Sequence, residues 1–547
     1  MIRYQKIISI LFSFILFVSA VSIPIATCCK DIVVTSPATA GDYNLLLKVR
    51  DPSRPGLQVL CRVPKGTMYT YHHPWTGKPW DFMVNSTFIG VATKGDTFPN
   101  IVKAGIALTD AGLAFGDADT GSNWINPTKQ AWDDFDWMRY AYQSAGTLEQ
   151  AIDLLTTEAI DRLHATGVSE NLFVVSPQNA VIIEADAVHH TTTPIQGILA
   201  MSNYPKDLWS TQLFKSLPLA SSFDSEKETW VRQGSIIHLG SICGVKIIQI
   251  GNNSLTAQAF PPFAFHPYGQ DEKITISPGK RGTVGPYSVD LLDIKENNAQ
   301  VSVRTLVNAW EQTLLGHIQP ALGKITVKTM MNLSRLHTID LDSLRPMCED
   351  AYPYEAVLIS QLPKEHANVL SCAWFSANHA CSSIYVPVHI CDTDIYDPYE
   401  TGEAAALSLE LLQHYGHGTL TKPFQNVEQV LIGETEAAET IAKELVEQHI
   451  DVSAFLTAVD TGIQQQAFLT EQLWLNLTKR SGEKNYTAIR TIIEHLWVKN
   501  YFVSLEQMEQ ALPLLKIYAE SNNLIGIIES MIRSIRTSQV AVLHIIE

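Results

Sequence analysis

The sequence is poor in basic residues and in long apolar segments. Its 547 residues include 39 Lys and Arg against 56 Asp and Glu, a formal net charge of −17 at pH 7. Nucleic acids and anionic lipids bind proteins through clustered cations, so this balance argues against both as partners. After the first residues, no segment is apolar for long enough to span a bilayer, so no stable membrane span is expected once a leader is removed.

Short metal-binding motifs are also missing. Neither Cys-x-x-Cys nor His-x-x-x-His occurs, and these spacings are typical of structural zinc, so the sequence predicts no metal and no other cofactor. His379 lies near Cys381, but this resembles a thiol-protease pair only superficially, and a disulfide is the expected state of Cys381. Apart from Cys28 and Cys29, the chain has six cysteines that would form up to three disulfides in an oxidising compartment, namely Cys61, Cys243, Cys348, Cys372, Cys381 and Cys391.

The first residues have the pattern of a secretory leader. A basic start precedes an apolar run over residues 7–21, and Pro24 follows this run. We expect residues 1–28 to be a signal peptide or propeptide, so that Cys29 becomes the first residue of a secreted or cell-surface protein. Three alternatives stay open: upstream cleavage with later trimming, lipid attachment to Cys28, and an uncut signal anchor.

The rest of the chain divides into two regions by composition. Residues 29–400 contain short apolar runs that end in turn residues, a helix that begins at Thr147 with a Thr147–Gln150 capping box, and a hairpin over residues 172–183. This pattern predicts an α+β domain in which antiparallel sheet dominates. Residues 401–547 are rich in Ala, Leu, Glu and Gln with helical spacing, which predicts a helical C-terminal region without a repeat.

Glu184 and one acidic stretch are expected to have structural roles. Glu184 ends an apolar run and is expected to anchor a loop through backbone amides. The acidic stretch at 133–136 lacks the spaced ligands of a calcium loop. It is better explained as the start of a helix, where acidic residues are favourable.

An exposed N-terminal Cys29 would combine a nucleophile and a base in one residue. A thiol with a pKa of roughly 8.5 is only slightly ionised at neutral pH. An α-amino group with a pKa of roughly 7.7 to 8.0 can accept the thiol proton directly or through a water. Cys29 would then attack an amide carbonyl and form an acyl-thioester, which water or an amine releases.

Several stretches resemble one enzyme family. They are CKDIVV at 29–34, ATAGD at 38–42, LKVRD at 47–51, AGLAFG at 111–116, ENLFVV at 170–175, SNY at 202–204 and SSIYVPV at 382–388. In order and spacing they resemble the N-terminal-nucleophile (Ntn) cysteine hydrolases of linear amides, which include cysteine dipeptidases, penicillin V acylase, bile salt hydrolase and acyltransferases. The resemblance covers residues 29 to 400 and implies a four-layer αββα sandwich with a helical C-terminal extension.

The resemblance also implies a role for four residues. Cys29 would be the nucleophile, Asp51 would orient its α-amino group, and Asn203 would donate to the oxyanion. Lys48 stands where the family has Arg and would lower the pKa of the thiol or hold a substrate carboxylate. It keeps the charge but loses the bidentate fork, which puts planar substrate recognition in doubt.

Three of these residues also fit structural roles. Asp51 also fits the start of a turn, Lys48 a solvated strand residue, and Asn203 a cap before Pro205.

The sequence therefore predicts a hydrolase of linear amide or peptide bonds, of the dipeptidase or acylase type, acting through an acyl-enzyme on Cys29. A small peptide or an N-acyl amide is the expected substrate. Two alternatives stay open: an acyltransferase to an amine acceptor, and a secreted binding protein that keeps the fold without reacting.

Overall fold

The computed structural model describes residues 29–51, 56–97, 102–120, 131–203, 205–208, 226–239, 244–260, 273–285, 287–342, 344–349 and 354–481. It contains both helices and strands, and its sheets are antiparallel. The α+β prediction is confirmed at this level. The expected leader at 1–28 lies outside the described residues.

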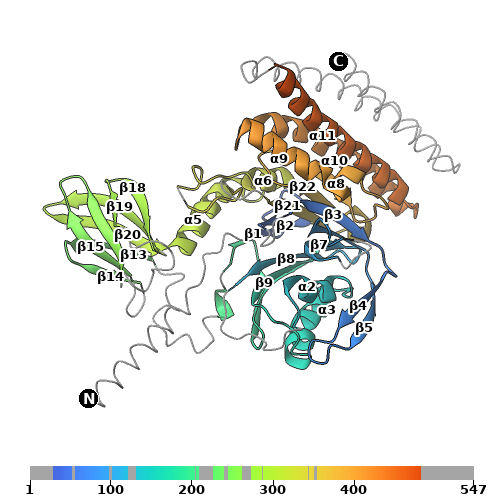
Figure 1. Ribbon diagram of the computed structural model, residues 1–547, viewed down its shortest axis with the longest axis horizontal. Coiled ribbons are helices and arrows are strands. Elements are labelled where there is room, and N and C mark those ends of the chain that lie inside the picture. Colours follow the sequence, from blue (N-terminus) through green and yellow to red (C-terminus); the bar gives the residue numbers. More distant parts are fainter. Residues whose placement is uncertain are drawn as a thin grey trace.

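The first large sheet has six strands and carries the start of the described chain (Figure 1). Its strands, in spatial order, are β12 (Ile198–Met201), β1 (Lys30–Val34), β2 (Tyr43–Arg50), β21 (Ala356–Pro363), β22 (Cys372–Ser376) and β23 (Val386–His389). β1 is buried along its whole length. Its branched residues 32–34 favour this extended conformation, as the sequence predicted.

The second large sheet has seven strands. In spatial order they are β11 (His190–Ile195), β10 (Ala180–Ala185), β9 (Glu170–Val175), β8 (Ala114–Asp119), β7 (Ala104–Thr109), β6 (Phe88–Thr93) and β3 (Gln58–Val63). The predicted hairpin is confirmed, because β9 and β10 pair with Val174 opposite Val181. A separate two-stranded ribbon consists of β4 (Met68–His72) and β5 (Pro79–Met83).

The two large sheets share one apolar core, to which Val33 and Leu46 of the first sheet and Ile106 and Phe173 of the second contribute. Helices cover the outer faces. The second sheet packs against α2 (Asp134–Tyr142), α3 (Leu148–Asp153) and the π-helix that continues it (Leu154–Arg162). The first sheet packs against α5 (Leu306–Ile318), the 3₁₀ turn Gln319–Ala321 and α6 (Val327–Leu333).

The predicted helix starts are confirmed, but the capping box is not complete, because the Gln150 side chain accepts from the N–H of Gly146 and not from that of Thr147. The Thr147 side chain accepts a hydrogen bond from the backbone N–H of Gln150 at the start of α3. The acidic stretch begins α2, where Asp133 is the N-cap and accepts from the N–H of Asp136.

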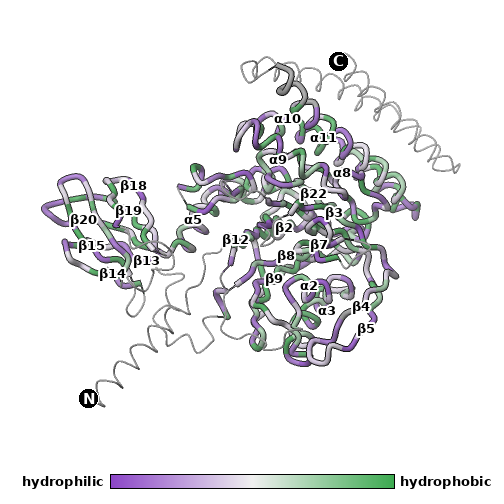
Figure 2. Tube along the Cα trace, in the orientation of Figure 1, coloured by the Kyte–Doolittle hydropathy of each residue, from purple (hydrophilic) through white to green (hydrophobic). Residues whose placement is uncertain are grey.

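The part of the chain that connects β12 to β21 contains a β-sandwich that the sequence analysis did not anticipate. One sheet contains β13 (Glu226–Arg232), β20 (Asn298–Thr305), β19 (Tyr287–Lys295) and β18 (Lys280–Val284); the other contains β14 (Ile236–His238), β15 (Gly244–Ile250), β16 (Leu255–Phe260) and β17 (Ile274–Ile276). Its own core includes Val245, Val289 and Val301. It stands apart from the large sheets, next to α5 (Figure 1). Buried and half-buried residues alternate along β16, and Figure 2 shows both hydrophobic and hydrophilic residues along these strands.

The helical C-terminal region is confirmed as far as the structure describes it. Its helices are α9 (Glu403–Tyr415), α10 (Thr421–Glu447) and α11 (Ser453–Ser481), whereas the short α7 (Ala367–Leu370) precedes this region and α8 (Asp397–Thr401) ends at its first residue. The helical spacing at 427–431 and most of that at 437–449 belong to one helix, α10, which ends at Glu447. The helical pattern that opens at Ser504 lies outside the described residues.

This helical region packs into the core of the two large sheets. Leu411, Phe424 and Ile463 belong to the same apolar cluster as Val33 and Phe173. The helices therefore complete the core. None of the helices in the described part of the chain is both long enough and apolar enough to cross a membrane.

Candidate active site

Cys29 lies immediately before β1, at the edge of the core between the two large sheets. Only 8% of its surface is exposed, and it shares an apolar cluster with Val33 and Leu46. The carbonyl oxygen of Cys29 lies 2.8 Å from the hydroxyl of Ser202, which follows β12. Pairing of β1 with both β2 and β12 thus fixes the start of the strand.

Lys48 is fully buried on the same face of the sheet, so the interpretation as a solvated strand residue is wrong. Its Nζ lies 2.7 Å from Oδ1 of Asp117 on β8 and 3.6 Å from Oδ2 of Asp31, its cross-strand neighbour. Burial lowers the pKa of Lys48, but these two carboxyls more than offset it and hold the pKa well above its usual value. Lys48 therefore carries its positive charge between the two sheets.

The close approach of the sheets at this point depends on Gly116. A Cβ at this position would lie 2.8 Å from Oδ1 of Asp31. Burial raises the pKa of Asp31 well above its usual value, although Lys48 opposes this effect. Asp31 is therefore held toward its neutral form, and Asp117 is the carboxyl closer to Nζ of Lys48.

The Cys29 thiol is not activated by its surroundings alone. Burial raises its pKa, Lys48 lowers it, and the nearby carboxyls of Asp117 and Asp119 raise it further. The thiol therefore stays protonated at neutral pH. A nucleophilic role for Cys29 needs a base that removes its proton.

Asp51 directly follows β2 and forms a buried ion pair that the sequence analysis did not predict. Its Oδ2 lies 2.7 Å from Nζ of Lys30, which also lies 2.5 Å from Oε1 of Glu349. Arg345 approaches the same Asp51 oxygen at 3.6 Å. Oδ1 of Asp51 is buried and has no hydrogen-bond partner among the described residues, so this atom is an available acceptor beside the start of β1.

Asn203 lies at the end of β12, in contact with two other parts of the chain. Its Nδ2 donates to the carbonyl oxygen of Asp119 at 2.8 Å, and its Oδ1 accepts from Nη1 of Arg345 at 3.1 Å. The same Arg345 nitrogen lies 2.8 Å from the Ser202 hydroxyl. An amide nitrogen carries two hydrogens. One N–H of Asn203 thus stays available for a substrate oxygen within the described part of the site.

Glu184 has the anchoring role that the sequence predicted. Its carboxylate accepts from the backbone N–H of Lys206 at 2.8 Å and of Leu208 at 2.6 Å. These bonds fix the segment that follows Asn203.

The sequence analysis missed Lys30, Arg345 and Glu349. Lys30 directly follows the candidate nucleophile in the sequence, so its position near the site could be predicted. The residues with which it forms ion pairs could not. Arg345 and Glu349 lie more than 300 positions along the chain, in a segment without regular secondary structure. No local pattern marks such residues, because folding alone brings them to β1.

The prediction of disulfides is not supported. Cys61, Cys348, Cys372, Cys381 and Cys391 are all free thiols, and Cys243 lies outside the described residues. Cys61, for example, lies on β3, and its sulfur contacts the carbonyl oxygen of Gly90 on the neighbouring strand β6. Cys348 and Cys381 do lie close together, in a group that also contains two histidines.

Three carboxyls near the candidate site lie close together. Oxygens of Asp117, Asp119 and Glu170 lie within 4.8 Å of one another. Burial, and next the charge of Asp119, raise the pKa of Glu170 well above its usual value. The raised pKa holds Glu170 toward its neutral form, which limits the negative charge around Lys48.

Comparison with known proteins gives weak likenesses only. No protein-family model matches the chain. No curated protein matches it either. Among solved structures, penicillin V acylase from Agrobacterium tumefaciens is similar with a TM-score of 0.34 and 8% identity, over 66% of this chain and 86% of that chain.

Two further structures are also only weakly similar. A mutant conjugated bile acid hydrolase from Clostridium perfringens has a TM-score of 0.34 and 9% identity, over 66% of this chain and 92% of that chain. A Caenorhabditis elegans ortholog of N-acylethanolamine-hydrolyzing acid amidase has a TM-score of 0.22 and 12% identity, over 32% and 70% of the two chains. Likeness this low carries no argument about the activity of this chain.

Proposed function

We propose that the protein hydrolyses linear amide bonds through an acyl-enzyme on Cys29, with a small peptide or an N-acyl amide as substrate. One observation carries the proposal: a thiol at the start of a buried strand lies within electrostatic reach of the buried cation Lys48, and the Ser202 hydroxyl links the backbone of the same residue to Asn203, an amide donor. The thiol supplies a nucleophile, the cation favours the thiolate, and the amide is a donor for an oxyanion.

The mechanism requires that residues 1–28 are removed. The new α-amino group of Cys29 then takes the thiol proton, and sulfur attacks the carbonyl carbon of the substrate. The tetrahedral intermediate collapses as the ammonium returns the proton to the departing amine. Water then attacks the thioester, and the freed thiol completes the cycle.

Three neighbouring groups have separate roles in this proposal. Lys48 stabilises the thiolate, which offsets part of the cost of burying it. Asp51 accepts a hydrogen bond from the α-amino group through its unpartnered Oδ1. Asn203 donates to the oxyanion, and loss of one such donor commonly costs about 3 to 4 kcal/mol of transition-state stabilisation.

We also propose the four-layer αββα arrangement, with export of the mature chain. Support for the layers comes from the three apolar clusters, since one lies between the large sheets and the other two lie between a sheet and helices. Support for export comes from the leader pattern at residues 1–28.

The raised pKa of Cys29 is consistent with the alternative of a binding protein as long as the leader stays attached. In that form the residue has an amide nitrogen and therefore no amine base. Removal of residues 1–28 would therefore decide between a hydrolase and a binding protein.

The test combines N-terminal analysis with single variants of the full chain. The mature protein should begin at Cys29, hydrolyse dipeptides or N-acyl amides, and become labelled at Cys29 by a thiol-directed acylating probe. Cys29→Ser should abolish or greatly slow turnover. The control is Cys61→Ser, another buried cysteine in the large sheets, which should keep activity.

Two results would contradict the proposal. Full activity of Cys29→Ser would exclude this sulfur as the nucleophile. A mature chain that begins upstream of Cys29 and does not react with the probe would favour the binding protein.

A further inference from the structure

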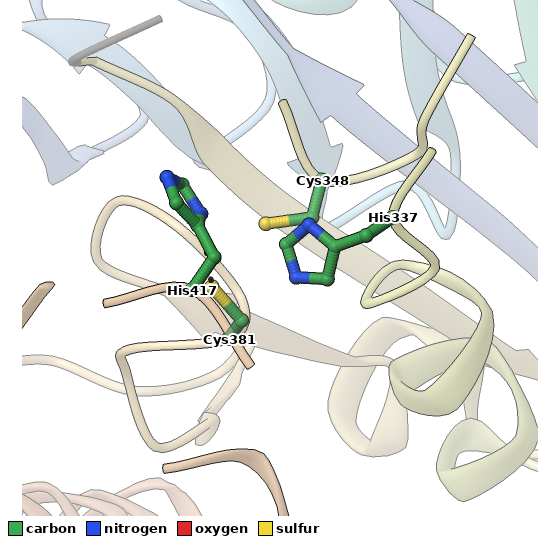
Figure 3. Close-up of side chains that lie close together, drawn as sticks. All are labelled: His337, Cys348, Cys381 and His417. Atoms are coloured by element: carbon green, nitrogen blue, oxygen red, sulfur yellow. Dashed lines mark hydrogen bonds between the residues drawn. The ribbon is translucent and has the colours of Figure 1, made fainter. Parts of the chain in front are cut away.

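Four potential metal ligands meet at the boundary between the sheets and the helical region. They are His337, Cys348, Cys381 and His417, and their ligand atoms all lie within 4.8 Å of one another. Figure 3 shows the four side chains pointing toward one another from four separate segments. The cysteines are buried, His337 is half-buried and His417 is exposed.

One ligand separation is close to that expected around a tetrahedral zinc ion. Zinc bonds of about 2.3 Å to sulfur and about 2.0 Å to nitrogen give S···N separations of about 3.6 Å at tetrahedral angles. Sγ of Cys381 lies 3.7 Å from Nδ1 of His417. This pair is therefore already at the separation that a shared zinc ion would impose.

Backbone hydrogen bonds hold the ligand segments in place without the ion. The N–H groups of Met347 and Cys348 both donate to the carbonyl oxygen of Leu336, which joins the segments of Cys348 and His337. His417 lies in the turn between α9 and α10, where Gly416 and Gly418 have positive φ angles that favour glycine.

A buried ion pair fixes the Cys381 segment beside them. Arg335 donates from Nε to the carbonyl oxygen of Ala380 and binds both carboxylate oxygens of Glu428 on α10. Glu428 in turn accepts from the backbone N–H of Tyr385. The site is thus preorganised by interactions that do not involve its ligands.

We infer that His337, Cys348, Cys381 and His417 bind a structural zinc ion. Two thiolates, two neutral imidazoles and tetrahedral geometry suit Zn²⁺ better than Ca²⁺ or Mg²⁺, which take oxygen ligands. The four protein ligands complete the coordination, so no position is open for a reacting water. The exposed His417 provides the entry path.

Two other arrangements use some of the same atoms. A Cys348–Cys381 disulfide would leave both histidines without a ligand role. A second group of Cys348, Glu355 and His379 offers three ligands, but Nδ1 of His379 already lies 2.9 Å from Oε2 of Glu355. The same Nδ1 lies 3.6 Å from Sγ of Cys348, but it carries at most one hydrogen, and the Glu355 oxygen is the closer acceptor.

The ion would tie the helical region to the segment that carries Arg345. Cys348 is adjacent to Glu349, which contacts Lys30 and Arg345, whereas His417 belongs to the helical region. Zinc would therefore stabilise the candidate active site from a distance. The inference concerns metal binding and stands whether or not Cys29 is catalytic.

The test uses the full chain, purified without chelators. We expect about one zinc per chain by elemental analysis, as four protein ligands define one site. After zinc removal, added Co²⁺ should give thiolate-to-cobalt charge transfer and the intense visible bands of tetrahedral cobalt. His417→Ala should weaken zinc binding by more than the roughly 100-fold that loss of an outer-shell partner causes.

His414→Ala is the matched control, because His414 is also exposed and lies on the preceding helix, α9. It should bind zinc as the native chain does. A double Cys348→Ser, Cys381→Ser variant should lose zinc entirely, and the exposed position of His417 keeps the test decisive if this double variant fails to fold.

Three results would overturn the inference. One is a metal-free chain that takes up no Co²⁺ and has both thiols free. Another is a Cys348–Cys381 disulfide in the natively produced protein without bound metal. The third is undiminished zinc binding by His417→Ala.

Discussion

Glu471 gives the helical region a pH-dependent attachment to the sheets. This residue lies on α11, and its Oε1 accepts from the backbone N–H of Ile384 at 2.6 Å and from the hydroxyl of Ser383 at 3.3 Å. Oε2 is buried with no hydrogen-bond partner among the described residues. Burial raises the pKa of Glu471 to about 8, although the two hydrogen bonds oppose the shift.

The sign of the effect follows from this raised pKa. At pH values below about 4.5, the carboxyl is neutral in both the folded and the unfolded chain. Above that value only the unfolded chain releases the proton readily, so folding becomes less favourable as the pH rises to about 8. Each pH unit costs about 1.4 kcal/mol, so the penalty grows by at most roughly 4 kcal/mol between about pH 5 and pH 8.

Glu471→Gln removes the charge and keeps an acceptor for the N–H of Ile384. The variant should therefore gain stability over the native chain as the pH rises, and thermal unfolding at pH 5 and pH 8 measures this. For a cooperative unit of this size, 1 kcal/mol corresponds to roughly 1 °C in Tm, so the gain should be roughly 4 °C larger at pH 8. Subtracting the native curve cancels other carboxyls with raised pKa values, such as Glu434.

A pH-independent difference between the two proteins would refute this reasoning. So would a variant that is less stable than the native chain at pH 8. Either result would mean that water reaches the Glu471 carboxylate or that the charge is balanced by a partner.

Two further predictions concern stability and use thermal or denaturant unfolding. Gly116→Ala should lower the free energy of unfolding by about 1 to 3 kcal/mol because its Cβ would collide with Asp31. Its control, Gly462→Ala, faces open space in α11 and should raise that free energy by up to about 1 kcal/mol. Equal effects of the two variants would contradict the close approach of the sheets. Arg335→Leu should cost about 3 to 5 kcal/mol because it leaves the Glu428 carboxylate buried and unpaired. Adding Glu428→Leu should recover much of the loss, and a double variant as unstable as the single one would argue against this pairing.

Local patterns predicted the regular elements well. The helix start at Thr147, the acidic start of α2 and the hairpin of β9 and β10 each depend on a few neighbouring residues. Propensity, capping and turn formation act over this short range, so the sequence displays them directly.

Parts of the fold that depend on long-range contacts were missed. The β-sandwich between β12 and β21 was read as part of one domain, because its strands resemble those of the large sheets. The helical region was expected as a separate unit, yet Phe424 and Ile463 complete the core of the sheets. Composition identifies helices but does not say which surface they cover.

The candidate site shows the same division. The resemblance pointed to Cys29, Lys48, Asp51 and Asn203, through stretches that form strands or strand ends. The burial of Lys48 against Asp117 was not predicted, because a lysine in a strand is usually solvated. Its environment depends on a second sheet that approaches closely at Gly116.

By itself, the sequence determined the mixed helix and sheet content, the helical character after residue 400 and the acidic surface charge, because these follow from composition and short-range periodicity. Only the tertiary structure decided which distant groups meet. Arg345 and Glu349 reach β1, and four ligands from separate segments converge between the sheets and the helices. Such meetings depend on the packing of whole layers, which no spacing of residues along the chain encodes.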